Sequence, residues 1–251
     1  MSLFNNYTKE GKGISKDPDN RLRIVVFFDI YFRKFWNLIL INLLYLVACI
    51  PIITIGPATA GVTKILRNYA REEHAFILAD FFETFKRNFW KALLVSIIDA
   101  VAAVLIYFDI VMYSSLEMGG AVTRTISLAV LMLSGTILLF MNYYIFTMMI
   151  TFDLNFKQLM KNAFIFAWIG FWRNLLITLI LAIITFFVLA YFSFIGTFLV
   201  IFLYFSTCGL IINFITYPLI KKHMIDGRDP KTGEKLEDNN IDEYEESEND
   251  D

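Results

Sequence analysis

The chain alternates between amphipathic segments and long apolar runs. No charged residue occurs in residues 35–63, 125–152 or 174–220, and a fourth run, residues 92–115, contains only Asp99 and Asp109. A helix needs about 20 consecutive apolar residues to cross a bilayer, so these runs are long enough for several crossings. The pattern predicts an all-α, polytopic membrane helix bundle.

Three apolar runs begin with the same pair of residues. Each pair follows an amphipathic segment, in residues 21–34, 79–88 and 156–170, and precedes a crossing segment. The preference of Trp for membrane interfaces explains one such pair, but three in the same context indicate an internal repeat. We therefore expect three interfacial elbows, where an amphipathic helix turns into a membrane helix. The elbow pairs are Phe35-Trp36, Phe89-Trp90 and Phe171-Trp172.

Basic residues are distributed unevenly between the links. Seven Lys and Arg precede residue 35, six lie in residues 64–91 and five follow residue 220, whereas Arg124 is alone in the link near residue 120. The positive-inside rule places the basic segments in the cytoplasm. The chain must then return between residues 35 and 71.

This topology amounts to three hairpins, at about 35–72, 90–151 and 172–220, each entered through an elbow at the cytoplasmic face. We expect five full spans plus one short or re-entrant returning helix, and a multi-pass protein of the cell membrane with both termini in the cytoplasm.

Composition divides the chain into three parts. The whole is 57% hydrophobic and 17% aromatic, well above an ordinary soluble domain. Residues 1–20 are a polar lead, residues 21–223 form the membrane domain, and residues 224–251 form an acidic tail. Nine acidic and no basic residues occupy positions 237–251, so we expect this tail to be disordered in the cytoplasm.

The returning leg of the first hairpin starts at an unusual break. Pro57 suits the first position of a helix and Gly56 the cap before it, while Gly61 helps keep the helix slim. Two interpretations remain open for this segment, which includes Thr59. One is close helix packing. The other is a binding site, because a helix that begins at membrane depth presents unpaired N–H groups to an anion.

Charged residues inside the predicted spans give a second hypothesis. Lys64 and Arg67 lie three residues apart on the returning helix, and Asp99 lies about ten residues into the next span. Charges in a bilayer are usually paired or beside water. The sequence therefore allows a pair between Lys64 or Arg67 and Asp99. The alternative is that the basic side chains reach the cytoplasmic face while Asp99 meets a water-filled cleft.

No catalytic motif accompanies these features. His74 and His223 have no second ligand at metal spacing, Cys49 and Cys208 lie in apolar runs, and no nucleophile or phosphate-loop motif is present. We expect no enzymatic activity, no cofactor, no metal and no nucleic-acid partner. The expected surroundings are the lipid bilayer and other membrane proteins.

One stretch resembles a known family. The run from Ile50 to Ala60 with its Gly56-Pro57 break, the basic helix after it, and Asp80-Phe81-Phe82 leading into the second elbow are similar to the YesL family of bacterial integral membrane proteins. The likeness is specific over about residues 25–95. It implies an association with carbohydrate importers of the ATP-binding-cassette type.

The resemblance thus implies permease and ATPase subunits as partners. No Glu-Ala-Ala loop, by which many importer permeases engage their ATPase, is present, which favours an accessory membrane subunit over a standard permease. Two alternatives remain. One is a stand-alone transporter or channel for small solutes, with its site in the broken first hairpin. The other is a membrane-anchored regulator that acts through the acidic tail.

Overall fold

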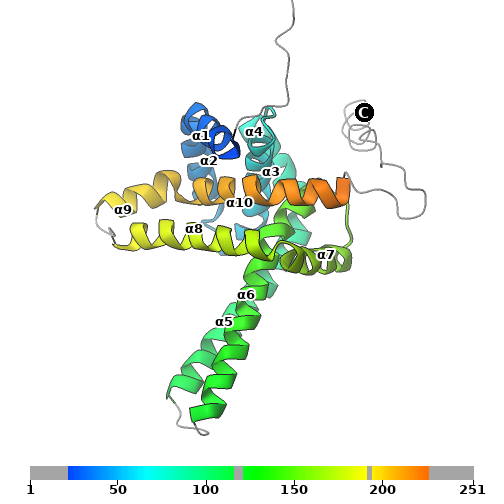
Figure 1. Ribbon diagram of the computed structural model, residues 1–251. Helices are drawn as coiled ribbons and strands as arrows, with labels where there is room; N and C mark the ends of the chain where they lie inside the picture. Colours follow the sequence, from blue (N-terminus) through cyan, green and yellow to red (C-terminus); the bar gives the residue numbers. More distant parts are fainter. Residues whose placement is uncertain (1–21, 116–120, 191–193, 226–251) are drawn as a thin grey trace, which may run out of the picture.

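The computed structural model describes residues 22–115, 121–190 and 194–225, and every regular element in these ranges is helical (Figure 1). The polar lead and the tail beyond residue 225 lie outside the described residues. The elements are α1 (Arg23–Arg33), α2 (Phe35–Ala48), η1 (Ile52–Thr54), α3 (Ile55–Ala70), α4 (Ile77–Arg87), α5 (Phe89–Ser115), α6 (Ala121–Thr151), α7 (Phe156–Ile169), α8 (Phe171–Ala190), α9 (Phe194–Leu199), η2 (Val200–Tyr204), α10 (Phe205–Ile220) and η3 (Lys221–Ile225).

In the described ranges, four helices are long and apolar enough to cross a membrane. They are α5, α6, α8 and the continuous helix Gly196–Ile225, which contains η2 and α10. The helix α2 has 14 residues, a length of about 21 Å at 1.5 Å per residue, whereas the hydrocarbon core is about 30 Å thick. The outgoing helix of the first hairpin, which the sequence predicted as the fifth full span, is therefore shorter than the hydrocarbon core is thick.

The first hairpin also turns differently from the prediction. The helix α2 ends at Ala48, and Pro51 lies in the link that follows it. The returning helix begins at Ile55, which makes Thr54 its cap and puts Pro57 in the third position rather than the first. Pro57 is tolerated there because the first N–H groups of a helix have no partner within it.

The three elbows have the same local geometry. A single residue links each amphipathic helix to the next helix, with φ and ψ of −104° and 13° at Lys34, −101° and 11° at Asn88, and −88° and 11° at Gly170. The Trp that follows is exposed in every case. The residues four positions after the link are all buried, namely Leu38, Ala92 and Asn174. At each elbow, the residue four positions after the link thus packs inside the protein, while the Trp faces outward.

The elbows divide the fold into three units, unit 1 (α1–α3), unit 2 (α4–α6) and unit 3 (α7–α10), whose contacts are cyclic. In unit 2, α4 and α5 pack on α3 of unit 1, and in unit 3, α7 and α8 pack on α6 of unit 2. The helix α2 packs on η2 and α10 of unit 3, which closes the ring. The returning helices α3, α6 and α10 also contact one another at the centre. The helix α3 is the most enclosed of them, with most of its side chains buried.

Side-chain contacts of α1 complete the closure of the ring on α10. The Arg23 guanidinium donates to the Phe214 carbonyl at 3.2 Å, and the Tyr31 hydroxyl lies 3.2 Å from the Thr207 hydroxyl. Burial, and secondarily the charge of Arg173, lower the pKa of Arg23. The first described helix is thereby joined to α10, far along the chain.

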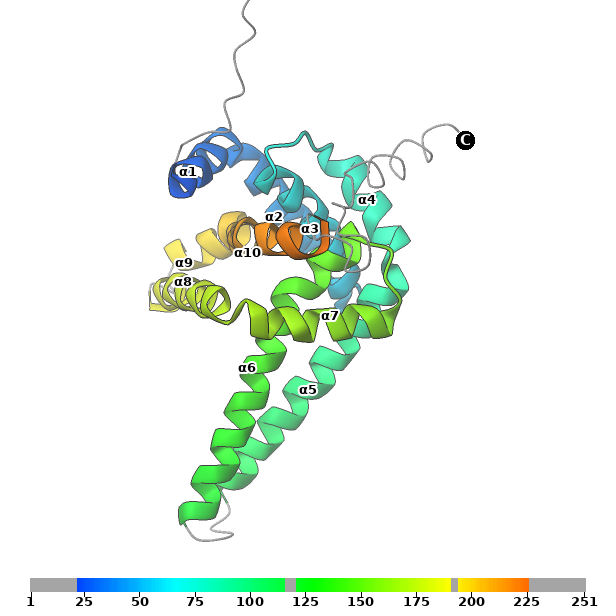
Figure 2. The ribbon, with the colours of Figure 1, turned by 45° about the vertical axis from the view of Figure 1, so that its right-hand side comes forward.

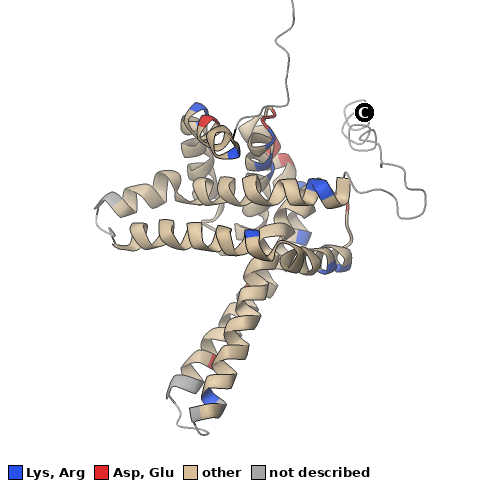
Figure 3. Cartoon of the chain, in the orientation of Figure 1, with Lys and Arg blue, Asp and Glu red and all other residues tan. Residues whose placement is uncertain are grey.

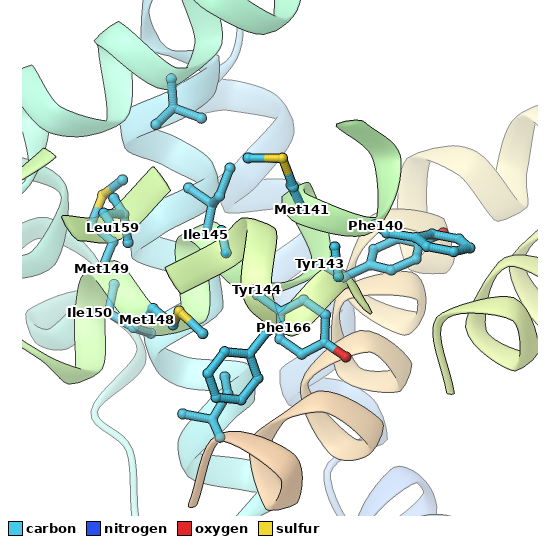
Figure 4. Close-up of a cluster of buried hydrophobic side chains, with 14 of the residues drawn as sticks. Phe140, Met141, Tyr143, Tyr144, Ile145, Met148, Met149, Ile150, Leu159 and Phe166 are labelled. Atoms are coloured by element: carbon cyan, nitrogen blue, oxygen red, sulfur yellow. The ribbon is translucent and has the colours of Figure 1, made fainter. Parts of the chain in front are cut away.

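The buried core lies near the elbows. One cluster gathers around the C-terminal half of α6, where Tyr144 and Met148 lie beside Leu159 and Phe166 of α7 (Figure 4). A second cluster surrounds α3 and includes Phe81 of α4. Both clusters are built from the amphipathic helices and the helix segments next to them.

The pair α5/α6 extends beyond this core. Figures 1 and 2 show it projecting away from the other helices in both views. Only 6% of the apolar window of α5 and 11% of that of α6 are buried, compared with 28% for the helix that contains α10. Within the part of the chain that the structure describes, most of the apolar surface of the projecting pair is therefore uncovered.

Candidate functional site

The start of α3, the first candidate site, is closed by helix packing. Gly56 lies directly against α5, where a Cβ atom would overlap the Ala92 carbonyl oxygen and the Ser96 hydroxyl. A Cβ atom at Gly61 would lie 2.7 Å from the Phe81 ring of α4. These close approaches give the small residues a packing role.

Two other residues of the candidate site fit the same packed environment. Pro57 is buried. Thr59 is partly buried, and its hydroxyl donates to the Ile55 carbonyl at 2.7 Å and lies 3.3 Å from the Tyr45 hydroxyl. The polar atoms of Thr59 are therefore engaged within the first hairpin.

The structure does not bring Asp99 together with Lys64 or Arg67. Asp99 accepts a hydrogen bond from Asn142 Nδ2 at 2.9 Å. Gly56 lies beside the first turns of α5, and α3 runs from there toward the elbows while α5 runs away from them. Arg67, 11 residues after Gly56, is about 16 Å farther along α3 at 1.5 Å per residue. The direction of the two helices thus separates the charges that the sequence allowed to pair.

Arg67 instead joins two returning helices. It is buried, and its Nη1 donates to Thr151 Oγ1 at 3.0 Å and to the Ile150 carbonyl at 3.3 Å on α6. Its Nε and Nη2 donate to Asn68 Oδ1 at 3.3 and 3.0 Å. Its guanidinium therefore stays in the protein and ties the end of α3 to the end of α6. Lys64 is partly buried on the same helix.

A second buried polar contact joins α6 to α10. The Thr147 hydroxyl donates to Asn213 Oδ1 at 3.0 Å, and Asn213 Nδ2 donates to the Gly209 carbonyl at 2.8 Å. The sequence did not indicate Thr147 as a partner in this contact. A lone Thr in an apolar helix gives no sequence signal, because its hydroxyl is usually satisfied within its own helix.

Asn42 joins units 1 and 3 through three hydrogen bonds. It is fully buried on α2, and its Nδ2 donates to the carbonyls of Val200 and Ile201 at 3.0 and 2.7 Å. Its Oδ1 accepts from the Ser206 N–H at 3.0 Å. The targets lie in or next to the π turn η2, where regular i to i−4 pairing is interrupted. One side chain of unit 1 thus satisfies three backbone groups of unit 3.

The pair Asp99–Asn142 is the main polar feature of the projecting helices. Asp99 lies ten residues after Phe89, which is about 15 Å along the helix and close to half the thickness of a hydrocarbon core. Its side chain is partly exposed. Among the described residues, Asn142 is the one hydrogen-bond partner of its carboxylate. A hydrogen-bonded carboxylate therefore lies near the middle of a largely uncovered apolar surface.

Basic residues surround the elbows, while the projecting pair is almost free of charge (Figure 3). Lys91, at the second elbow, lies 3.1 Å from Asp153 and donates to the Leu154 carbonyl at 3.2 Å. This contact ties the start of α5 to the link between α6 and α7. Charge is thus concentrated on the side of the molecule where the amphipathic helices lie.

A polar cleft of about 180 Å³ lies where α1 and α3 end. Arg33 lies 3.7 Å from Glu72 across it, and Lys34 Nζ lies over the Tyr69 ring at 5.2 Å from its centroid. The cleft presents both signs of charge beside the first elbow.

Taken with the four long apolar helices, these features define an all-helical, multi-pass membrane protein with a packed centre. Residues 38–110 match the model of a family described as "Protein of unknown function, DUF624". The matched segment extends from α2 to α5 and includes the closed start of α3, the second elbow and Asp99. Comparisons with curated proteins and with solved structures gave no match.

Proposed function

We propose that the chain is an accessory membrane subunit of an ATP-binding-cassette carbohydrate importer. The observation that carries this proposal is the contrast between the closed start of α3 and the uncovered surface of the pair α5/α6. A solute pathway needs polar groups that line a route open to water, whereas a subunit that binds other membrane proteins needs exposed surface. The choice of a sugar importer rests on the resemblance of residues 25–95 to the YesL family.

We also propose the membrane arrangement that this role requires. The three elbows lie at the cytoplasmic face, both termini are cytoplasmic, and the first hairpin is re-entrant because α2 is short. Exposed Trp at each elbow and the gathering of Lys and Arg around the amphipathic helices (Figure 3) support this orientation.

Labelling of single cysteines tests the arrangement. With Cys49 and Cys208 replaced by Ala, Glu73→Cys should react with a membrane-impermeant maleimide only when the cytoplasmic side is accessible. Thr59→Cys should react slowly from either side, because it lies in the packed start of α3. Reaction of Glu73→Cys only from the outside would overturn the three-hairpin arrangement.

Co-purification tests the functional proposal. The tagged full-length chain, extracted in a mild detergent, should retain the permease and ATPase subunits of a carbohydrate importer co-expressed with it. A co-expressed importer for a different class of solute is the control. Equal recovery of both importers, or of neither, would refute the proposal.

Two further outcomes would favour the alternative functions. Recovery of the chain alone, with solute flux after reconstitution into liposomes, would identify a stand-alone transporter or channel. Loss of sugar uptake on deletion of residues 237–251, with the importer still bound, would identify a regulator that acts through its acidic tail.

A further inference from the structure

The projecting pair α5/α6 carries the mid-depth carboxylate of Asp99 on a surface that the other described residues leave uncovered. We propose that this surface binds a transmembrane helix of another protein that carries a basic side chain near mid-membrane. The inference rests on the proposed function in so far as an accessory subunit has membrane partners. It adds the surface and the chemistry by which one of them is recognised.

Charge complementarity identifies the class of partner. The Asn142 amide donates to Oδ1 of Asp99, and within the described residues no other hydrogen bond reaches this carboxylate. An ionised carboxylate in hydrocarbon is costly unless it is paired. A Lys or Arg on a neighbouring helix supplies both the missing charge and the missing donors.

The surface around the carboxylate allows a second helix to approach closely. Ala103 lies one turn after Asp99 and is exposed. Gly135 lies two turns before Asn142, and a Cβ atom placed on it would contact Ile106 of α5 at 3.6 Å, so Gly135 lies where the two projecting helices meet. Small residues at such positions let the backbones of membrane helices come together. The small side chain of Ala103 thus leaves room for a partner helix beside the carboxylate.

A second copy of the chain fits this surface poorly. Two copies joined through the same face would bring one Asp99 toward the other, and like charges in a low-dielectric medium repel strongly. The charge therefore favours a different protein with a basic residue.

Designed transmembrane peptides test the inference without knowledge of the natural partner. The probe is a polyleucine helix with one central Lys, and its control is the same helix with a central Leu. Each carries an acceptor dye, and the full-length protein, reconstituted in nanodiscs, carries the donor. The Lys peptide should bind about tenfold more tightly than the Leu peptide, the scale of a strong polar contact between membrane helices.

Variants of the chain make the test specific. Asp99→Leu should abolish the preference for the Lys peptide, and Asp109→Leu, a control on the same helix, should leave it unchanged. Asp99→Asn retains an amide to pair with Asn142 and should weaken the preference in a protein that still folds. Equal binding of both peptides to the wild-type protein would overturn the inference. Energy transfer between two labelled copies of the chain, if Asp99→Leu abolished it, would also overturn the inference, because the surface would then bind a second copy.

The test separates this inference from the proposed function. Importer subunits that co-purify equally with the wild-type chain and with Asp99→Leu would leave the proposed function intact and remove the inference. A preference for the Lys peptide without any co-purification of importer subunits would support the inference and refute the proposed function.

Discussion

Replacing Asn42 by Leu tests the hydrogen bonds that join units 1 and 3. Asn42 hydrogen-bonds three backbone groups of unit 3 and is fully buried. Leu is branched at Cγ like Asn, but it is larger and more apolar, so the substitution removes the hydrogen bonds and adds some overpacking. The loss of stability beyond that caused by a second Asn→Leu substitution on the same helix therefore reports mainly on the polar contact.

The expected loss follows from the three bonds. Each net hydrogen bond contributes about 1 kcal/mol, and a buried N–H left without a partner costs about 1–3 kcal/mol. We expect Asn42→Leu to lower the free energy of unfolding by about 3 kcal/mol, which is about 100-fold in the folding equilibrium. The π turn should change as well, because Asn42 satisfies the backbone groups that its wider geometry leaves unpaired.

An unfolding titration with SDS in mixed micelles, followed by Trp fluorescence, measures this loss. The matched control is Asn37→Leu on the same helix, which removes one hydrogen bond, from Asn37 Nδ2 to the Tyr69 hydroxyl at 3.1 Å. It should cost about 1 kcal/mol. If Asn42→Leu destabilises the protein no more than Asn37→Leu does, the three bonds are not a main link between units 1 and 3.

Other substitutions test packing and polar contacts elsewhere. In the same titration, Gly56→Ala should destabilise by about 2 kcal/mol, because it meets a backbone carbonyl of α5 that cannot move aside. Gly135→Ala, whose Cβ atom makes only an ordinary contact with Ile106 at 3.6 Å, should stabilise by up to about 1 kcal/mol. Equal effects of the two substitutions would contradict the packing argument. Tyr144→Phe should lower the free energy of unfolding by about 1–2 kcal/mol, because it leaves Asn174 Oδ1 buried without the hydroxyl that donates to it at 2.7 Å. An unchanged midpoint of thermal unfolding would show that this donor is dispensable. Lys91→Met removes a partly exposed ion pair and should cost less than about 1 kcal/mol, so a loss above about 2 kcal/mol would contradict its assignment as a surface contact.

Local patterns predicted most of the helices. The apolar runs predicted the segments that became α2, α5, α6, α8 and α10, and the Phe-Trp pairs predicted the position of each elbow to within one residue. The boundaries were less predictable around Gly56-Pro57. There the helix begins earlier, at Ile55, because a short 3₁₀ turn and Thr54 make the bend before the proline.

The candidate site shows the limit of such patterns. The sequence indicated that Gly56 and Gly61 lie where something approaches closely, and the structure supplies α5 and α4 as the approaching elements. It could not indicate that Asp99 has Asn142 as its neighbour, because that choice depends on which end of α3 lies against α5. The relative directions of the helices decided the pairing.

The sequence alone determined the helices, their elbows and the division of charge between links and spans, because each depends on the spacing of residues close together in the chain. Only the tertiary structure decided that each outgoing helix packs on the returning helix of another unit, with α2 closing the ring on α10. Apolar helix surfaces are chemically alike, so partners are selected by close approach and by a few buried polar groups. Gly56, Asn42 and Arg67 make such contacts, and each contact joins residues far apart in the chain.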